Sequence, residues 1–424
     1  MPLSARESSL CHRVAARASA LLEDLAAHVA IPTGTGHASG IDHYRGLLLA
    51  RLEALGGTAR LVPGEPRPAW LRLPHARDPI DAPPPPTAVV SRSGSDGPPA
   101  ILLAGHLDTV HDPRGSFREL AVAPDGLTAS GPGAADMKGG ILIAVAALEC
   151  LAEEGHDLGW TFVLNADEEI GSFQSAAALR EAATVHRVGL ALEPALPDGS
   201  LVIERMGTGM FRIDAHGRAA HVGREFARGA SAVYALARTI TRIEAMVDLE
   251  AGRILNIGPI EGGSVVNAVP DHAAAWGNVR FRDAATQSAL EQEVLALATR
   301  GDALPSIDVH AIFNRPAKPF TPPVQRLARF VRDTAEDLGQ TMPFASTGGV
   351  CDGNILQEAG LPTLDTLGVR GGNLHRNDEY IEVSSLVDRC QLLATLLLRL
   401  SLGLDQALEP QERAEPPGRP RNAG

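Results

Sequence analysis

The order of apolar segments along this 424-residue chain constrains its fold more than any other feature. Helical segments alternate with short, apolar, strand-like runs at 87–91, 100–104, 160–165 and 188–192. The predicted helix at 139–154 is almost wholly apolar, so we expect it to be buried. Strands that alternate with helices are typical of a mostly parallel sheet covered on both faces, and the chain is therefore predicted to have an α/β fold.

This alternation changes between residues 207 and 318. Predicted elements there follow the order β-α-β-β-α-β, which is typical of a ferredoxin-like unit. We expect strands at 209–215, 254–260, 273–282 and 307–313, with helices at 230–246 and 284–298. The first pattern then resumes, with predicted helices at 324–338 and 384–402 and a strand at 363–366. The sequence thus predicts a larger domain (1–206 plus 319–403), an inserted α+β domain (207–318) and a polar, proline-rich, disordered tail (404–424).

Charge and composition exclude several kinds of partner. The formal net charge is -13 and no basic block is present, which argues against nucleic acid. No run of about eighteen apolar residues exists, so no membrane span is expected. Residues 1–32 predict an amphipathic helix and not a signal peptide, and the proline-rich residues 78–86 predict a loop. The four cysteines lie far apart without a CxxC pair, which favours reduced thiols and a cytoplasmic location.

Imidazole and carboxylate side chains follow the predicted strands or lie in adjoining loops. They are His106, Asp108, Asp136, Glu168, Glu169, Glu193 and His375. Strand ends line the ligand crevice of open α/β sheets, so these groups can converge there. Together they suit zinc, cobalt or manganese. Each one alone has an ordinary explanation, such as a solvated helix start for the two adjacent glutamates. The prediction of a metal site therefore depends on the whole set.

The chain resembles the glutamate carboxypeptidase, acetylornithine deacetylase and succinyl-diaminopimelate desuccinylase family of co-catalytic zinc hydrolases, especially the folate-cleaving bacterial glutamate carboxypeptidases. The resemblance runs from IPTGTG to the final predicted helix and rests on HLDTV, GPGAADMKGG, DEEIGS, LEP, RAAHVG, SVVNAVP, NVRF and LHRNDEY, in this order. It implies a mostly parallel-sheet zinc-peptidase catalytic domain. The inserted ferredoxin-like domain would be a lid that also mediates dimerisation.

The resemblance implies two Zn²⁺ ions, with Co²⁺ or Mn²⁺ as alternatives. His106 and Glu193 would bind the first ion, while Glu169 and His375 would bind the second. Asp136 would bridge the two, which holds such ions about 3.5–4 Å apart. The peptide bond after Asp136 is expected to be cis.

Three further residues receive catalytic roles from the resemblance. Asp108 would orient His106 through the second ring nitrogen. Glu168 would be the general base that takes a proton from water and passes it to the leaving nitrogen. His221 would reach the site of a partner subunit and donate to the developing oxyanion; the alternative is an ordinary loop histidine.

Substrate contacts are also implied. They fall on Asn267, Arg280, Arg315, Gly348 and Gly349. The arginine fork suits a carboxylate. Cys351 is expected near the substrate, either as a thiol open to reagents or as a small buried spacer. Glutamate at position 193 is typical of the carboxypeptidases and deacylases of the family, whereas its aminopeptidases tend to carry aspartate there.

The predicted reaction is therefore hydrolysis of a small amide or peptide that releases a C-terminal amino acid with a free carboxylate, with glutamate as a candidate. An N-acyl-amino-acid deacylase or a dipeptidase could use the same residues. A binding protein without activity would be expected to lack the base or a metal ligand. We expect a homodimer formed through the lid.

Overall fold

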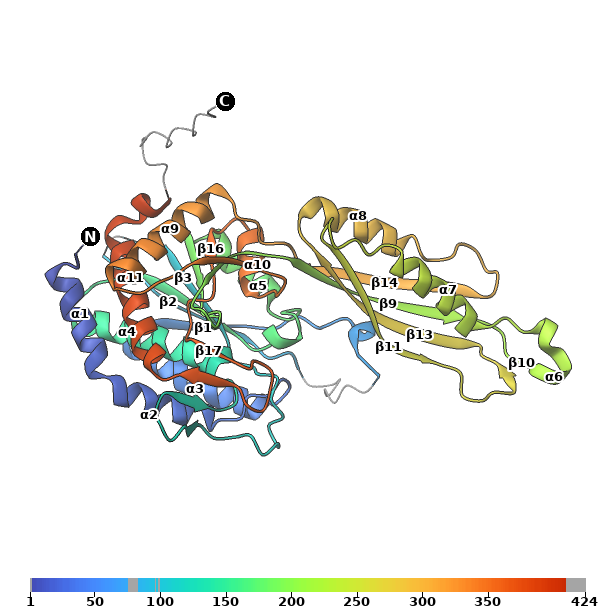
Figure 1. The fold of residues 1–424 in the computed structure, drawn as a ribbon, viewed down its shortest axis with the longest axis horizontal. Coiled ribbons are helices and arrows are strands. Elements are labelled where there is room, and N and C mark those ends of the chain that lie inside the picture. The colour runs from blue at the N-terminus through green and yellow to red at the C-terminus, as the bar shows by residue number, and fades with distance from the viewer. Residues whose placement is uncertain (1, 75–82, 96, 98–99, 409–424) are drawn as a thin grey trace, which may run out of the picture.

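The computed structural model describes residues 2–74, 83–95, 97 and 100–408, which form two lobes (Figure 1). Most of the predicted loop at 78–86 and the predicted tail beyond residue 408 lie outside these residues. Residues 404–408, expected to belong to the disordered tail, instead continue the last helix, and Ala407 is buried in the core. No helix in the described part of the chain has the length and apolar character needed to span a membrane.

The larger lobe is built around a six-stranded sheet. Its strands in spatial order are β1 (Thr58–Val62), β2 (Thr87–Arg92), β6 (Trp160–Asn165), β3 (Ile101–His106), β7 (Val188–Ala191) and β16 (Thr363–Leu364). From β6 to β16 the neighbours are parallel, whereas β2 pairs antiparallel with both β1 and β6. The sheet is thus mixed but mostly parallel, as expected, because β2 alone of its six strands runs in the opposite direction. β2 and β3 run in opposite directions and are close in sequence, whereas a parallel crossover needs about a dozen residues or more.

Helices cover both faces of this sheet. Ile101 and Leu103 of β3 pack into one core with α4 (Gly140–Glu153), whose buried position agrees with its apolar sequence. Leu102 and Ala104 point to the opposite face, as the alternation of a strand requires, and pack with α5 and α10. The other helices are α1 (Ala5–Ala16), α2 (Ala18–Val29), α3 (Ala38–Ala54), α5 (Ala176–Thr184), α9 (Pro322–Asp337), α10 (Asp352–Glu358) and α11 (Ser384–Leu408).

The predicted N-terminal helix is divided into α1 and α2 at Arg17. The Arg17 guanidinium forms ion pairs with Glu149 and Glu153 of α4, which ties this break to the buried helix. Smaller strands flank the core: β8 (Leu201–Arg205) pairs with β15 (Phe344–Thr347), while β4 (Ala121–Val122), β5 (Thr128–Ser130), β18 (Tyr380–Glu382) and β17 (Gly371–Gly372) form a separate sheet.

The smaller lobe has its own antiparallel sheet and its own core. The strand order is β11 (Arg253–Gly262), β13 (His272–Phe281), β9 (Gly207–His216) and β14 (Ser306–Arg315), with α7 (Ala232–Glu244) and α8 (Ala284–Leu295) on one face (Figure 1). This strand order, with chain order β-α-β-β-α-β, is that of a ferredoxin-like unit. The other face carries Trp276, whose indole Nε1 donates to the Trp70 carbonyl of the larger lobe at 3.1 Å.

Two chain segments join the lobes and are held together. Arg205 and Lys318 exchange both backbone hydrogen bonds, each 3.0 Å long. Their side chains share the buried Asp365 carboxylate, at 2.7 and 3.2 Å. The buried Asn354 amide of α10 donates to the carbonyl groups of Met206 at 2.9 Å and Pro316 at 2.7 Å. One side chain of the larger lobe thus fixes both connections.

Replacing Asn354 with alanine is expected to lower the free energy of unfolding by about 1–3 kcal/mol, because both connecting segments lose a hydrogen-bond donor. Urea-induced unfolding measures this change. Gln357→Ala is the matched control, since Gln357 lies on the same helix and donates only to the Pro319 carbonyl in an exposed contact. Equal losses in the two variants would show that Asn354 has no special role in the connection.

Candidate metal centre

The predicted ligand residues converge at the carboxyl ends of β3, β6 and β7. His106 is the last residue of β3, Glu193 follows β7, and Glu169 lies in a 3-10 turn after β6. Asp136 lies in the turn Ala134–Gly139 that precedes α4, and His375 follows β17. Parallel strands end at the same edge of a sheet, so this placement follows from the topology.

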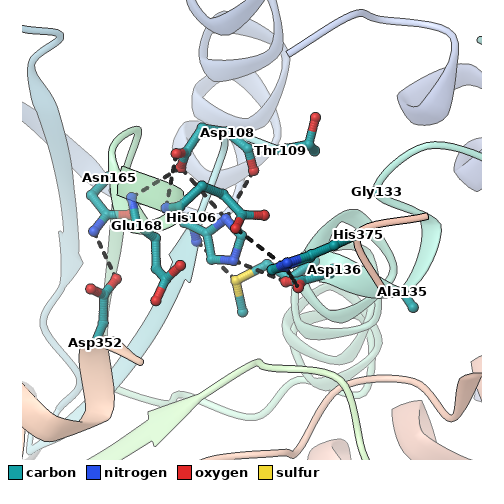
Figure 2. Close-up of polar contacts among 12 residues, drawn as sticks. His106, Asp108, Thr109, Gly133, Ala135, Asp136, Asn165, Glu168, Asp352 and His375 are labelled. Atoms are coloured by element: carbon teal, nitrogen blue, oxygen red, sulfur yellow. Dashed lines mark hydrogen bonds and ion pairs between the residues drawn. The ribbon is translucent and has the colours of Figure 1, made fainter. Parts of the chain in front are cut away.

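These side chains form two groups that share one residue. His106, Asp136 and Glu193 make the first group, and Asp136, Glu169 and His375 make the second; within each, the potential ligand atoms lie within 4.8 Å of one another. Figure 2 shows His106 and His375 on two sides of Asp136. The Asp136 Oδ1 atom is 3.1 Å from His106 Nε2, and Oδ2 is 3.4 Å from His375 Nε2. The peptide bond after Asp136 is cis, as expected.

The electrostatics of the groups suit cations. Burial, with the Asp136 charge second, raises the pKa of Glu169 from 4.5 to about 10. Burial and Glu168 likewise raise the pKa of Glu193 well above its usual range. Burial opposes ionisation of Asp136 as well, but hydrogen bonds from His106 and His375 lower its pKa overall. The Glu169 Oε1 atom is buried without a hydrogen-bond partner. A mixed oxygen and nitrogen donor set with such an orphaned oxygen fits bound divalent cations.

Asp108 contacts the His106 ring, as expected, but chiefly through its main chain and not its side chain. Its main-chain carbonyl, at 2.9 Å, is the nearest acceptor for His106 Nδ1, whereas its carboxylate lies 3.5 Å from that nitrogen. The carboxylate instead accepts the amide hydrogens of Glu168 at 3.2 Å and Glu169 at 3.1 Å. Asp108 therefore positions the glutamate turn with its side chain and the His106 ring chiefly with its backbone.

Arg315 also departs from the expectation of an open substrate contact. Its side chain is buried, and its Nη2 atom lies 2.8 Å from the Glu168 carboxylate and donates to the Glu168 carbonyl. The Asp352 Oδ1 atom lies 3.7 Å from the same Nη2 atom. Burial raises the pKa of Glu168, and the Arg315 charge opposes this rise. In this structure the guanidinium supports Glu168, so the predicted grip on substrate needs correction.

The remaining predicted residues fall into two places. Arg280, on the face of β13 opposite the helices, donates to the Gly348 carbonyl at 3.4 Å, next to the exposed Gly349. His221 and Asn267 are exposed and lie elsewhere. His221 is the last residue of β10 (Ala220–His221), which pairs with β12 (Ala268–Val269), and Asn267 directly precedes β12. Figure 1 places β10 at the end of the smaller lobe farthest from the larger one. The fold therefore does not bring His221 or Asn267 to the metal groups of the same chain.

Cys351 is a buried residue at the start of α10, and burial raises the pKa of its thiol well above the usual range. This favours the spacer alternative over a reactive thiol. Sequence reasoning passes over two buried acids of the site, Asp352 and Glu379. Asp352 accepts from Asn165 at 2.7 Å, and Glu379 contacts the turn that carries Asp136. Both contacts join segments far apart in the chain; Glu379 belongs to the motif LHRNDEY, but the motif does not reveal the contact.

Comparison with known proteins identifies the family. The family model for Peptidase family M20/M25/M40 matches residues 102–399. Carboxypeptidase G2 of Pseudomonas sp. (strain RS-16) is 28% identical over 402 residues, covering 91% of this chain and 90% of the relative. A succinyl-diaminopimelate desuccinylase of Methylobacterium nodulans is 30% identical over 349 residues, covering 75% and 84%.

Solved structures show the same fold. Aminopeptidase PepT from Bacillus cereus aligns with a TM-score of 0.70 at 20% identity, covering 90% of this chain and 98% of that one. An M20 family metallo-carboxypeptidase from Sulfolobus solfataricus aligns with a TM-score of 0.69 at 15% identity, covering 89% and 98%. With the ligand groups above, these matches show that the chain belongs to peptidase family M20/M25/M40 and is a metal-dependent hydrolase of amide bonds.

Proposed function

We propose that this hydrolase is a carboxypeptidase with two zinc ions, which releases a C-terminal amino acid with a free carboxylate. The observation that carries the proposal is the sharing of Asp136 by two ligand groups. Glutamate is the first candidate for the released amino acid, in line with the likeness to carboxypeptidase G2. Cobalt or manganese would suit the same donors. Free cysteines in the described chain support a cytoplasmic location.

Each side chain has a distinct task in this proposal. His106 and Glu193 would hold the first ion, Glu169 and His375 would hold the second, and Asp136 would serve both. The bound pair supplies Lewis acidity toward the amide carbonyl and lowers the pKa of water. Glu168 accepts a proton from the attacking water and then donates it to the leaving nitrogen. Its carboxylate is held at 2.8 Å by Arg315, which fixes the direction of the transfer.

The smaller lobe is proposed to be a lid and a dimerisation domain. Within the described residues, no strand pairs with the outer edge of β11, and Ile254 and Ile260 on that strand are exposed. Such an edge favours pairing with another copy. His221 and Asn267, remote from the centre of their own chain, would then contact substrate in a second subunit. Arg280 would hold the substrate carboxylate beside Gly348 and Gly349 as the lid closes.

A deacylase is the second candidate function. The observation that favours it is the likeness to a desuccinylase over 75% of the chain, at an identity comparable with that to carboxypeptidase G2. A deacylase would use the same metal ligands and the same base, and would differ in the acyl side of the substrate. A dipeptidase is a further variant of the same chemistry.

Metal content and substrate preference test the proposal together. We expect two divalent ions per chain, and hydrolysis of N-acyl and peptidyl glutamates that chelator abolishes. The α-methyl ester of each substrate is the matched control and should react poorly, because it cannot pair with an arginine. Equal rates for acid and ester would contradict the carboxypeptidase assignment. A strong preference for N-succinyl substrates would favour the deacylase.

The base and the cross-subunit histidine can be tested in one experiment. Glu168→Gln is expected to lower kcat about 10²–10⁴-fold with both metals retained, because glutamine can still accept from Arg315 but cannot take a proton. His221→Ala should also lower kcat without loss of metal. Mixed dimers of the two variants should regain part of the activity, since one site would then be complete. Proven mixed dimers without any activity would rule out the shared site.

The stability of the metal-free protein is expected to fall as pH rises. Below pH 4.5, Glu169 is protonated in both the folded and the unfolded chain, so it contributes no difference. Between pH 4.5 and about 10 the unfolded chain loses this proton while the folded chain retains it, which favours unfolding. Glu193 acts in the same direction. Thermal unfolding after chelation should therefore show a midpoint that declines from pH 5 to pH 9.

Adding zinc should remove most of that slope, because ligand carboxylates must be deprotonated to bind metal. A metal-free midpoint independent of pH in this range would contradict the electrostatic description of the centre.

A further inference from the structure

The Glu379 carboxylate lies behind the metal groups and binds the turn that carries Asp136. Its Oε1 atom accepts the amide hydrogens of Ala135 at 2.8 Å and Asp136 at 3.0 Å. Its Oε2 atom accepts the Gly133 amide at 3.2 Å and lies 2.6 Å from His111 Nε2. The side chain is 1% exposed. Three backbone amide donors and the His111 ring thus converge on one buried carboxylate.

The backbone around Glu379 strengthens this connection. Its carbonyl accepts from the Gly131 amide at 3.1 Å and from the Ser130 hydroxyl at 2.8 Å. His375, a proposed ligand of the second ion, lies in the loop that leads to Glu379, and the Glu379 amide closes that loop onto the Arg376 carbonyl at 3.1 Å. One residue therefore joins the segment that presents His375 to the segment that presents Asp136.

His111 completes the arrangement from the other side. The ring is buried, packs edge-on against Phe117 with centroids 5.3 Å apart, and borders a cavity of about 170 Å³. Its Nε2 atom is the ring nitrogen that faces Glu379. The hydrogen bonds of Glu379 to the backbone of residues 133–136 give the pair a route to the Asp136 side chain.

We propose that Glu379, together with His111, is a positioning pair that sets the two Asp136 oxygens toward two separate cations. This inference rests on the proposed dinuclear centre. Asp136 is common to both ligand groups, so a displacement of its turn would weaken the binding of both ions at once. A residue that merely stabilised the fold would lower the unfolding temperature without such a joint effect on metal binding.

Competition with a chromophoric chelator tests the pair by measuring the affinity for zinc. Glu379→Gln keeps the size of the side chain but places an amide group where two donors need an acceptor. It should weaken both zinc sites about 10–100-fold, the usual effect of losing a partner behind a metal ligand. The loss of activity at low zinc should be reversed by excess zinc, with KM unchanged. Glu382→Gln is the matched control, because Glu382 is the last residue of β18, the strand that directly follows Glu379, and pairs with Arg370 instead; this variant should bind zinc like the wild type.

His111→Gln is the second variant, and it gives the same measurement if Glu379→Gln does not fold. The double variant should lose no more affinity than the worse single variant, since the two residues act as a unit. Unchanged zinc affinity in either folded variant, or a lower unfolding temperature alone, would overturn the proposal. Absence of zinc binding in the wild type would instead overturn the dinuclear centre itself, so the two failures are distinct.

Discussion

Repulsion among buried carboxylates is the constraint on which the rest of this structure depends. Asp136, Glu168, Glu169 and Glu193 meet at one edge of the sheet, and burial disfavours the charge on each. Such a cluster is stable only with counter-charges, which the two histidines and Arg315 supply in part. The sheet topology, the turn before α4 and the Glu379 contacts can all be understood as means of holding like charges where cations can balance them.

The two-lobed arrangement separates this demand from substrate recognition. The larger lobe carries the acidic cluster on a rigid sheet, while Arg280 lies on the smaller lobe and meets the glycine loop only at the junction. In the proposed function, Arg280 binds the substrate from a separate lobe and does not neutralise the carboxylates in the absence of substrate. The two connecting segments, paired at Arg205 and Lys318, hold the lobes together at this junction.

The sequence could predict the ligand groups because each member belongs to a local motif beside a strand, and strand ends converge for general reasons. It could also predict the ferredoxin-like unit, since that topology follows from element order. It could not predict that Arg315 pairs with Glu168, that Asp108 uses its main-chain carbonyl for His106, or that Arg17 divides the first helix. Each of those contacts depends on which distant segments pack together, and no spacing along the chain records that.

The pairing of Arg315 with Glu168 has a physical consequence for the reaction. Burial raises the pKa of the Glu168 carboxyl group. The Arg315 charge, 2.8 Å away, opposes this rise. The buried geometry thus favours a role for Arg315 beside Glu168, and Arg280 stays the residue proposed to bind the substrate carboxylate.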